Sequence, residues 1–403
     1  MDVLTSLAVI CLLALSLGAL CARLRLPPLL GMLIVGILLG PYVLDGISPT
    51  LLAISGELRQ VALIIILMRA GLNLNLKDVK QNGVAAALMC FVPASVEIVA
   101  YTLLGRWLLG LTYSEAAILG CVMAAVSPAV VVPRMLSLKE QKLGTDKGIP
   151  DMIMTGASAD DVYTILLFTS LVAMEKGGSF SLDIAWKLPV SIVAGVGAGV
   201  GAGLLFAWFV RRVHLRNSVK VILLLSFSFL FVSLENTGLP FSGLLAVISF
   251  GASFFAAHAV CAARLSQKFS RLWVFAEILL FVLVGAQVNI GYALQNCGPI
   301  IGVVLLATAF RMGGVCLCVA GSKLNAKEKL FCAIAYMPKA TVQAAIGPLP
   351  LSMGLACGET VLTAAVLGIL ITAPLGAFLT DLLGKRLLRR EESPQAHEAI
   401  SDV

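Results

Sequence analysis

Two adjacent acidic side chains stand inside an apolar stretch of this sequence, Asp160 and Asp161 in TGASADDVYTILLF. They fall about ten residues into the run 150–174, which is long enough to cross a bilayer, so they would lie near mid-membrane. A charge at that depth costs at least about 2.5 kcal/mol and is usually paired or functional. Neighbouring residues on a helix point about 100° apart, so one carboxylate can face an aqueous cavity while the other faces another helix. Hydroxyl groups that would suit a hard monovalent cation stand nearby, on Thr155, Ser158 and Thr164.

Further charges fall within apolar stretches elsewhere in the chain. The basic ones are Arg69, Arg311 and Lys339, and the acidic ones include Glu97 and Glu277. Charges at membrane depth are expected to pair with one another or to mark an ion pathway. A buried aspartate pair neutralised by protonation or by basic partners is the alternative. Two acids side by side at this depth favour a polar interior site.

Two apolar stretches are interrupted by proline at matching places. AAVSPAVVVPRML (124–136) contains Pro128 and Pro133, and YMPKATVQAAIGPLP (336–350) contains Pro338 beside Lys339. Proline removes a backbone N–H and clashes with the preceding turn, so each helix should kink or unwind. Paired broken helices in corresponding halves indicate a transporter's midplane site, although one proline kink alone is common in membrane helices. Lys339 would then neutralise the carbonyl ends of the helices where they cross.

The elements that must position these residues are membrane-spanning helices. The chain of 403 residues is 59% hydrophobic and 13% charged, with a mean hydropathy of +0.99, which is too apolar for a soluble globule. The fold class predicted is therefore an all-α polytopic membrane protein of about thirteen transmembrane helices. The predicted spans are 3–21, 29–45, 57–76, 83–105, 115–136, 150–174, 186–210, 218–234, 239–259, 271–291, 299–321, 327–350 and 360–382.

The basic residues test this assignment of spans. With the N-terminus outside, 22 of the 29 Lys and Arg residues fall on the inner side and four on the outer side. Basic loops stay cytoplasmic, and a wrong count would scramble the alternation. The net charge of +7 is thus a topology signal, and a nucleic-acid partner has no support. We expect an integral protein of a bacterial inner membrane, with the N-terminus outside and the C-terminus in the cytoplasm.

The two halves of the chain correspond to each other. Spans 4, 5 and 6 carry Glu97, the Pro128 break and the aspartate pair, and spans 11, 12 and 13 carry Arg311, the Pro338 break and a further proline. An interval of seven spans, an odd number, places the two triplets in opposite orientations, which is an inverted repeat. Glu97 and Arg311 occupy equivalent positions and are predicted to form a buried ion pair.

These segments together resemble the cation/proton antiporter superfamily, in its Nha-type branch of sodium/proton antiporters and closest to the NHA exchanger subgroup. The resemblance runs from span 1 to span 13 and includes ILMRAGLNLNL (66–76) and AEILLFVLVGAQVNI (276–290). It implies a homodimer with two domains per protomer. The dimerisation domain would comprise 1–76 and 218–291, and the ion-transporting core 83–174 and 299–382. A linker helix (186–210) and a short cytoplasmic tail (391–403) complete the chain.

The resemblance also implies roles for residues. Asp161 matches the essential ion-binding and proton-exchanging acid, Asp160 the acid beside it, and Arg311 stands where many electrogenic relatives have a lysine. Arginine does not release its proton, so we expect electroneutral exchange of Na⁺ or Li⁺ for H⁺ by alternating access. The transported ions would bind directly to Asp161 and Asp160, with no cofactor and with the lipid bilayer as the surroundings.

Other functions remain alternatives. An ion-coupled symporter of organic solutes with a related crossed-helix fold is the most serious, and a K⁺/H⁺ antiporter is another. A passive cation channel would favour a ring of acids from several subunits. An intramembrane aspartyl protease needs two carboxyl groups that share a proton across a small gap. Asp160 and Asp161 diverge on one helix, so a transporter is expected and not an enzyme.

Overall fold

The computed structural model describes residues 2–74, 83–176, 182–235, 237 and 241–390, and this part of the chain is built of helices. The first half contains α1 (Val3–Arg23), α2 (Pro28–Leu39), α3 (Pro49–Ala53), α4 (Ser55–Gly71), α6 (Gly83–Met89), α7 (Val92–Leu108), α8 (Tyr113–Met123), α9 (Pro128–Glu140), α10 (Ile149–Lys176) and α11 (Leu182–Arg212). The second half contains α12 (Asn217–Glu235), α13 (Gly243–Ala257), α14 (Ala259–Ala286), α15 (Ile290–Cys318), α16 (Ala326–Ala335), α17 (Thr341–Ile346), α18 (Leu349–Ser352) and α19 (Gly358–Leu387).

Nine helical stretches among the described residues are long and apolar enough to cross a membrane. Two shorter helices, α2 and α13, are also apolar. The all-helical membrane fold is therefore confirmed, while the count of thirteen spans stays a prediction. Where the sequence predicts a span at 29–45, α2 ends at Leu39, and where it predicts 299–321, α15 begins nine residues earlier at Ile290.

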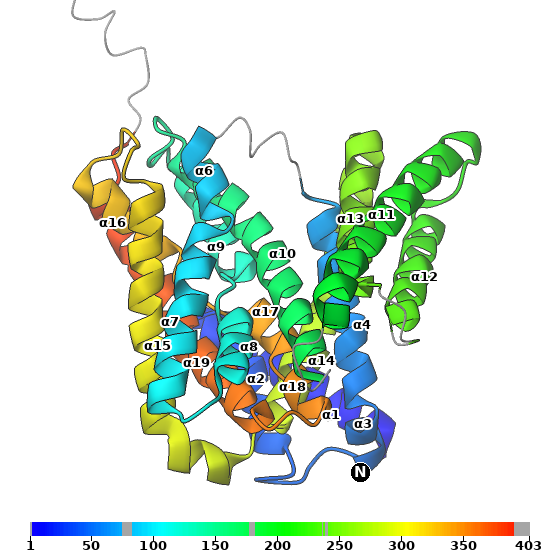
Figure 1. The fold of residues 1–403 in the computed structure, drawn as a ribbon, viewed down its shortest axis with the longest axis horizontal. Coiled ribbons are helices and arrows are strands. Elements are labelled where there is room, and N and C mark those ends of the chain that lie inside the picture. The colour runs from blue at the N-terminus through cyan, green and yellow to red at the C-terminus, as the bar shows by residue number, and fades with distance from the viewer. Residues whose placement is uncertain (1, 75–82, 177–181, 236, 238–240, 391–403) are drawn as a thin grey trace, which may run out of the picture.

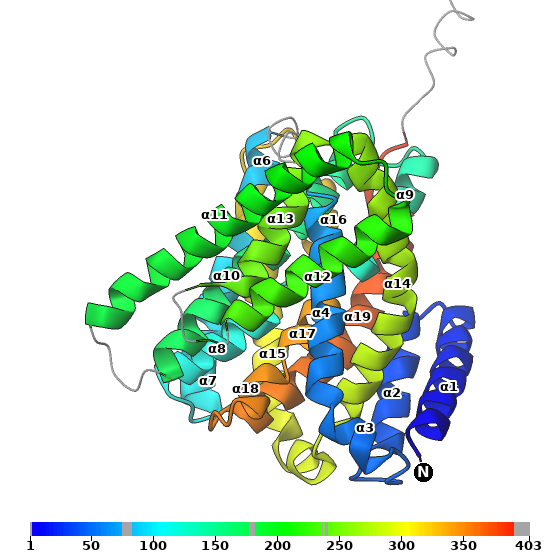
Figure 2. The same cartoon turned by 90° about the vertical axis from the view of Figure 1, so that its right-hand side faces the viewer.

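The helices pack in two groups. In one group α7 packs against α8 and α15, α10 against α8 and α9, and α19 against α15 and α16. In the other group α14 packs against α2 and α4, and α13 against α4, α11 and α12. Figure 2 shows the face of the molecule that the second group forms. In this view α11 and α12 lie across α13, and α1 lies at the right-hand edge. The division of the chain into an ion-transporting core, a dimerisation domain and a linker stays a prediction.

The helix predicted as a linker, α11, lies along α13. A Cβ added to Gly195, Gly199 or Gly203 would meet α13 or the residue before it, whereas one added to Gly197 or Gly201 would meet open space. Small residues at intervals of four let two membrane helices approach backbone to backbone. The alternating glycines of this segment therefore hold α11 to the second group of helices.

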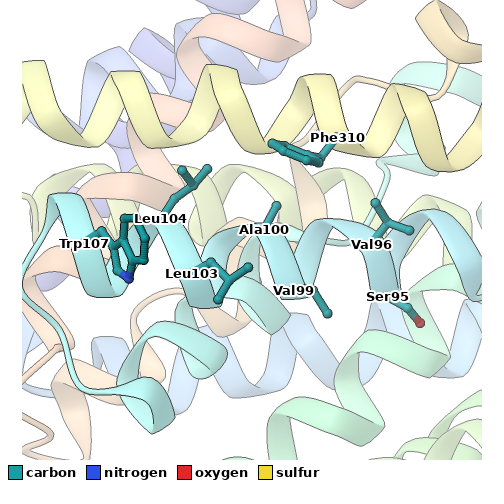
Figure 3. A pocket seen from close by; sticks show the side chains of 8 residues that line it. All are labelled: Ser95, Val96, Val99, Ala100, Leu103, Leu104, Trp107 and Phe310. Atoms are coloured by element: carbon teal, nitrogen blue, oxygen red, sulfur yellow. The ribbon is translucent and has the colours of Figure 1, made fainter.

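Apolar side chains cover the outer face of α7 (Figure 3). Val96, Val99, Leu103 and Trp107 follow one another at helical spacing and line a groove of about 500 Å³, with Phe310 of α15 on the opposite wall. Large apolar side chains exposed on a membrane-spanning helix are expected to face lipid. Glu97 is not part of this lining and is fully buried, so α7 has its polar face turned into the protein.

Candidate ion-binding site

Two extended breaks meet in the interior of the first group of helices. The chain leaves the helical conformation at residues 124–127, between α8 and α9, and again at 337–340, between α16 and α17. Pro128 is the first residue of α9, where its missing N–H costs no hydrogen bond, and Pro338 lies within the second break. The Ser127 backbone N–H donates to the Pro338 carbonyl over 2.8 Å, so the two breaks are in direct contact. Pro133, which the sequence also assigns to the crossing, lies inside α9 beyond the break.

The carbonyl groups that the first break leaves without helical partners are bound by side chains. Lys339 Nζ donates to the Met123 carbonyl over 2.6 Å, and Arg311 Nη1 donates to the Ala124 carbonyl. Gln343 Nε2 donates to the Ala125 carbonyl over 2.8 Å. The last carbonyls of a helix carry partial negative charge, so two cations and an amide compensate the end of α8.

Arg311 joins both breaks to two carboxylates. Its Nη1 lies 3.0 Å from Glu97 Oε2 and its Nη2 lies 2.7 Å from Asp160 Oδ2. Its Nε donates to the Tyr336 carbonyl over 2.9 Å, and the guanidinium lies 5.0 Å from the centroid of the Tyr336 ring. A planar guanidinium with five donors can bind several acceptors at once, and lysine in this place could not reproduce that set.

Glu97 has a second cation beside it. Lys339 Nζ lies 2.6 Å from Glu97 Oε1. The side chains of Glu97, Arg311 and Lys339 are each at most 1% exposed. The predicted pair of Glu97 with Arg311 is thus one part of a network that also contains Lys339 and Asp160. Removing one member of a buried ionic network leaves an uncompensated charge.

The two aspartates of α10 have different contacts. Asp160 is fully buried, and its Oδ2 also accepts a hydrogen bond from the Val126 backbone N–H over 2.9 Å, within the first break. Asp161 is 8% exposed, and among the described residues no cation lies within ion-pair distance of it. Asp160 Oδ1 and Asp161 Oδ1 are buried without a hydrogen-bond partner in the described part of the chain. The two neighbours face different surroundings, as adjacent positions on a helix require.

The buried charges of this site do not balance. Glu97, Asp160 and Asp161 supply three carboxyl groups, against the two cations Arg311 and Lys339. Two of the carboxylates are paired, and the third is Asp161. Burying an unpaired charge is costly, so Asp161 requires either a proton or a bound cation. The arrangement can therefore hold one monovalent positive charge.

The remaining residues predicted for ion binding lie on α10. Thr155 is half-buried, and six residues on a helix amount to 1.7 turns, so it points about a third of a turn away from Asp161. The side chain of Ser158 lies outside the described residues. Thr164 Oγ1 donates to the backbone carbonyls of Asp160 and Asp161, each over 3.1 Å, so its hydroxyl proton is occupied. The roles of Thr155 and Ser158 as ion ligands stay predictions.

Sequence reasoning missed two side chains at the crossing. Ser127 is fully buried next to Val126, and its Oγ has no hydrogen-bond partner among the described residues. Gln343 is fully buried in α17 and follows Lys339 by four residues. The sequence contained a signal for each of them. Ser127 stands directly before the proline of a predicted break, and Gln343 stands four residues after Lys339.

Comparison with known proteins agrees with this geometry. Residues 8–384 match the family described as "Sodium/hydrogen exchanger, transmembrane". The chain is 35% identical over 390 residues to sodium/hydrogen exchanger 9B2 of Homo sapiens, covering 93% of this chain and 72% of that protein. It is 33% identical over 388 residues to sodium/hydrogen exchanger 9B1 of Homo sapiens, covering 92% and 74%. The sodium proton antiporter MjNhaP1 of Methanocaldococcus jannaschii superimposes with a TM-score of 0.79 at 20% identity, covering 96% of this chain and 98% of that one.

The chain has an all-helical membrane fold with two crossed helix breaks around a buried acidic site, and this is the fold of a cation/proton antiporter of the Nha type. The chain belongs to the sodium/hydrogen exchanger family. The expected resemblance is thereby confirmed, and the chain is an integral membrane protein of a family of ion exchangers.

Proposed function

We propose that this protein exchanges Na⁺ for H⁺ and that Asp161 is the group for which the two ions compete. The observation that carries the proposal is the buried excess of one carboxylate over the two cations of the network. A proton and a sodium ion each bring one positive charge, and the Asp161 carboxylate cannot hold both. Loading one ion therefore expels the other. Li⁺ would occupy the same place, and Na⁺ or Li⁺ fits the family better than K⁺.

The same charge count supports electroneutral exchange. Arg311 keeps its proton at any attainable pH, and it forms ion pairs with both Asp160 and Glu97. Lys339 is held between Glu97 and the Met123 carbonyl. With these four groups fixed, the site carries no net charge with either H⁺ or Na⁺ on Asp161. One proton would then move for each sodium ion.

Alternating access is proposed to follow from the packing of the helices. The groups that form the site all lie on α7, α10, α15 and the crossed breaks, which belong to one packing group. We propose that this group moves as the core against α1–α4 and α12–α14, which would form the contacts of a homodimer. Cross-linking of the purified protein in membranes, followed by denaturing electrophoresis, tests the dimer.

The orientation of the chain is also part of the proposal. The excess of basic residues on one side favours a cytoplasmic C-terminus and an N-terminus outside. The relatives named above come from a mammal and an archaeon, so the assignment to a bacterial inner membrane rests on the sequence prediction alone. Protease access to a C-terminal tag in sealed right-side-out vesicles tests the orientation.

Exchange can be measured with purified protein in liposomes that contain a pH dye. External Na⁺ or Li⁺ should raise the internal pH, because protons leave as the cation enters. K⁺ and organic solutes added at the same concentration should leave it unchanged. Absence of any response to Na⁺, or a response that requires an organic solute, would contradict the proposal and favour the symporter alternative.

A further inference from the structure

One end of the core is held together by a set of contacts away from the ion site, which we name the clasp. Its residues are Leu143, Gly144 and Lys147 of the loop between α9 and α10, Glu328 of α16, and Arg389 and Arg390 after α19. In Figure 1 this loop and α16 lie at the same end of the molecule.

The first part of the clasp is an ion pair with a buried carboxylate. Lys147 Nζ donates to both oxygens of Glu328, over 2.9 Å to Oε1 and 2.7 Å to Oε2. The Glu328 side chain is only 1% exposed, whereas that of Lys147 is 27% exposed. Glu328 also closes a capping box with Asn325 at the start of α16, where an acidic side chain is stabilised by the helix end. The carboxylate is thus fixed by its own helix and presented to the lysine.

The second part is a backbone connection to the end of the chain described here. The Gly144 N–H donates to the Arg389 carbonyl over 2.8 Å, and Leu143 forms an antiparallel bridge with Arg390. Leu143 and Leu388 are both buried in a cluster with side chains of α9 and α16. The loop itself turns tightly, with positive φ at Lys142, Gly144 and Gly148. The clasp therefore ties α9, α10, α16 and α19 at one end.

Three of these four helices border a break or carry the aspartates, and the fourth, α19, contacts the second break. α9 and α16 flank the breaks on this side, α10 begins at Ile149 and carries Asp160 about 16 Å further on, and α19 supplies Thr372 Oγ1 to the Lys339 N–H over 3.0 Å. A shift of α10 relative to the breaks would move Asp160 away from the Val126 N–H and Arg311.

We propose that Lys147 and Glu328 are positioning residues for the ion site, which hold α10 in register with the two broken helices. The inference rests on the proposed function, because its readout is the affinity for the transported ion. Glu328→Gln removes the charge while an amide can still close the capping box, so the helix start is retained. Lys147→Met removes the other partner and keeps the length of the side chain.

The chain offers a matched control for this pair. Lys139 Nζ lies 2.7 Å from Asp151 Oδ1 and joins α9 to α10 next to the same loop, but both side chains are 40% exposed. Exposed ion pairs contribute little to stability and hold position weakly. Lys139→Met should therefore leave transport unchanged, and Lys147→Arg should retain the wild-type behaviour because it keeps the cation.

The test measures the Na⁺ dependence of exchange in liposomes for equal amounts of monodisperse protein. We expect Lys147→Met and Glu328→Gln to raise the apparent KM for Na⁺ several-fold, with the two controls at the wild-type value. A chain that ends at Leu387 should show the same rise, and one that ends at Arg390 should not. A lower Tm with an unchanged KM would mean that the clasp has only a structural role, and this would overturn the proposal. An equal rise in KM for Lys139→Met would overturn it as well.

Failure of this proposal is distinguishable from failure of the proposed function. If the wild-type protein shows no Na⁺-driven proton movement, the function is contradicted. If the wild-type protein exchanges ions and the clasp variants keep its KM, only the positioning role is contradicted.

Discussion

At the scale of single residues, the cost of burying a charge made the site visible in the sequence. Asp160, Asp161, Arg311 and Lys339 stand out because each lies in an apolar stretch, and the structure brings Arg311 into contact with Asp160 and with Glu97. The contact of Lys339 with Glu97 was not predictable in the same way. It depends on how closely the second break passes the first, which no pattern of residue types specifies.

Glu97 is expected to be the residue of this network whose removal costs most stability. Glu97→Ala leaves Lys339 without a carboxylate and Arg311 with Asp160 alone, and breaking a buried pair costs about 3–5 kcal/mol. The Tm of the purified protein in detergent should fall markedly. Asp151→Ala, which removes a partner of the exposed pair, is the control and should change the Tm little. Equal melting of the two variants would show that the network does not stabilise the fold.

Ser127 is expected to contribute to ion affinity and not to stability. Its hydroxyl is buried at the crossing without a hydrogen-bond partner among the described residues, so Ser127→Ala removes no hydrogen bond seen in that part of the chain. The rise in Tm on addition of Na⁺ should be smaller for this variant, while its Tm without Na⁺ should match the wild type. Ser228→Ala is the control, because Ser228 is also buried and donates to the Leu224 carbonyl away from the site. An undiminished response of Ser127→Ala to Na⁺ would exclude the hydroxyl from the ion site.

At the scale of elements, the positions of proline predicted where the two breaks lie, but not how far the helices on either side continue. Pro128 begins α9 and Pro338 lies in the second break, as the chemistry of proline requires, whereas α9 continues through Pro133 and α19 through Pro374. A proline inside a membrane helix is tolerated where neighbouring groups satisfy the freed carbonyl. Whether a given proline breaks a helix therefore depends on tertiary contacts that a local sequence window does not contain.

The crossing should be sensitive to added volume on α19. A Cβ added at Gly376 would lie 2.5 Å from Cγ and 2.9 Å from Cδ of Pro338, whose ring cannot turn aside. Gly376→Ala should displace the second break and destabilise the protein by about 1–3 kcal/mol, with slower exchange. At Gly313 on α15 no neighbouring atom lies within 4 Å of the added Cβ among the described residues, so Gly313→Ala should leave both Tm and exchange rate unchanged. The same response from both variants would mean that α19 does not press on the break.

At the scale of the whole molecule, hydropathy and the sidedness of basic residues predicted a polytopic helical membrane protein, and this is confirmed. The count of thirteen spans stays a prediction, because α2 and α13 are short and the helices around the breaks are interrupted. Short helices lack the length by which a span is recognised.

Electroneutrality is a property of the complete transport cycle. With Arg311 paired to Glu97 and Asp160, only one proton is expected to move for each Na⁺. A membrane potential set with K⁺ and valinomycin should therefore leave the Na⁺ and H⁺ gradients at equilibrium unchanged in proteoliposomes. A shift of that equilibrium with voltage would demonstrate net charge movement and remove the inference drawn from Arg311.

Competition of Na⁺ and H⁺ for Asp161 is the central claim, and substitution of that residue tests it most directly. Asp161→Asn keeps the size of the side chain and removes the charge that the buried network leaves unpaired. The measurement is the internal pH of proteoliposomes after an external pulse of Na⁺, with wild-type protein at equal density beside it. We expect no Na⁺-driven rise in internal pH for the variant, while its Tm and its elution as a monodisperse species are retained. Substantial Na⁺/H⁺ exchange by Asp161→Asn would contradict the assignment of the site.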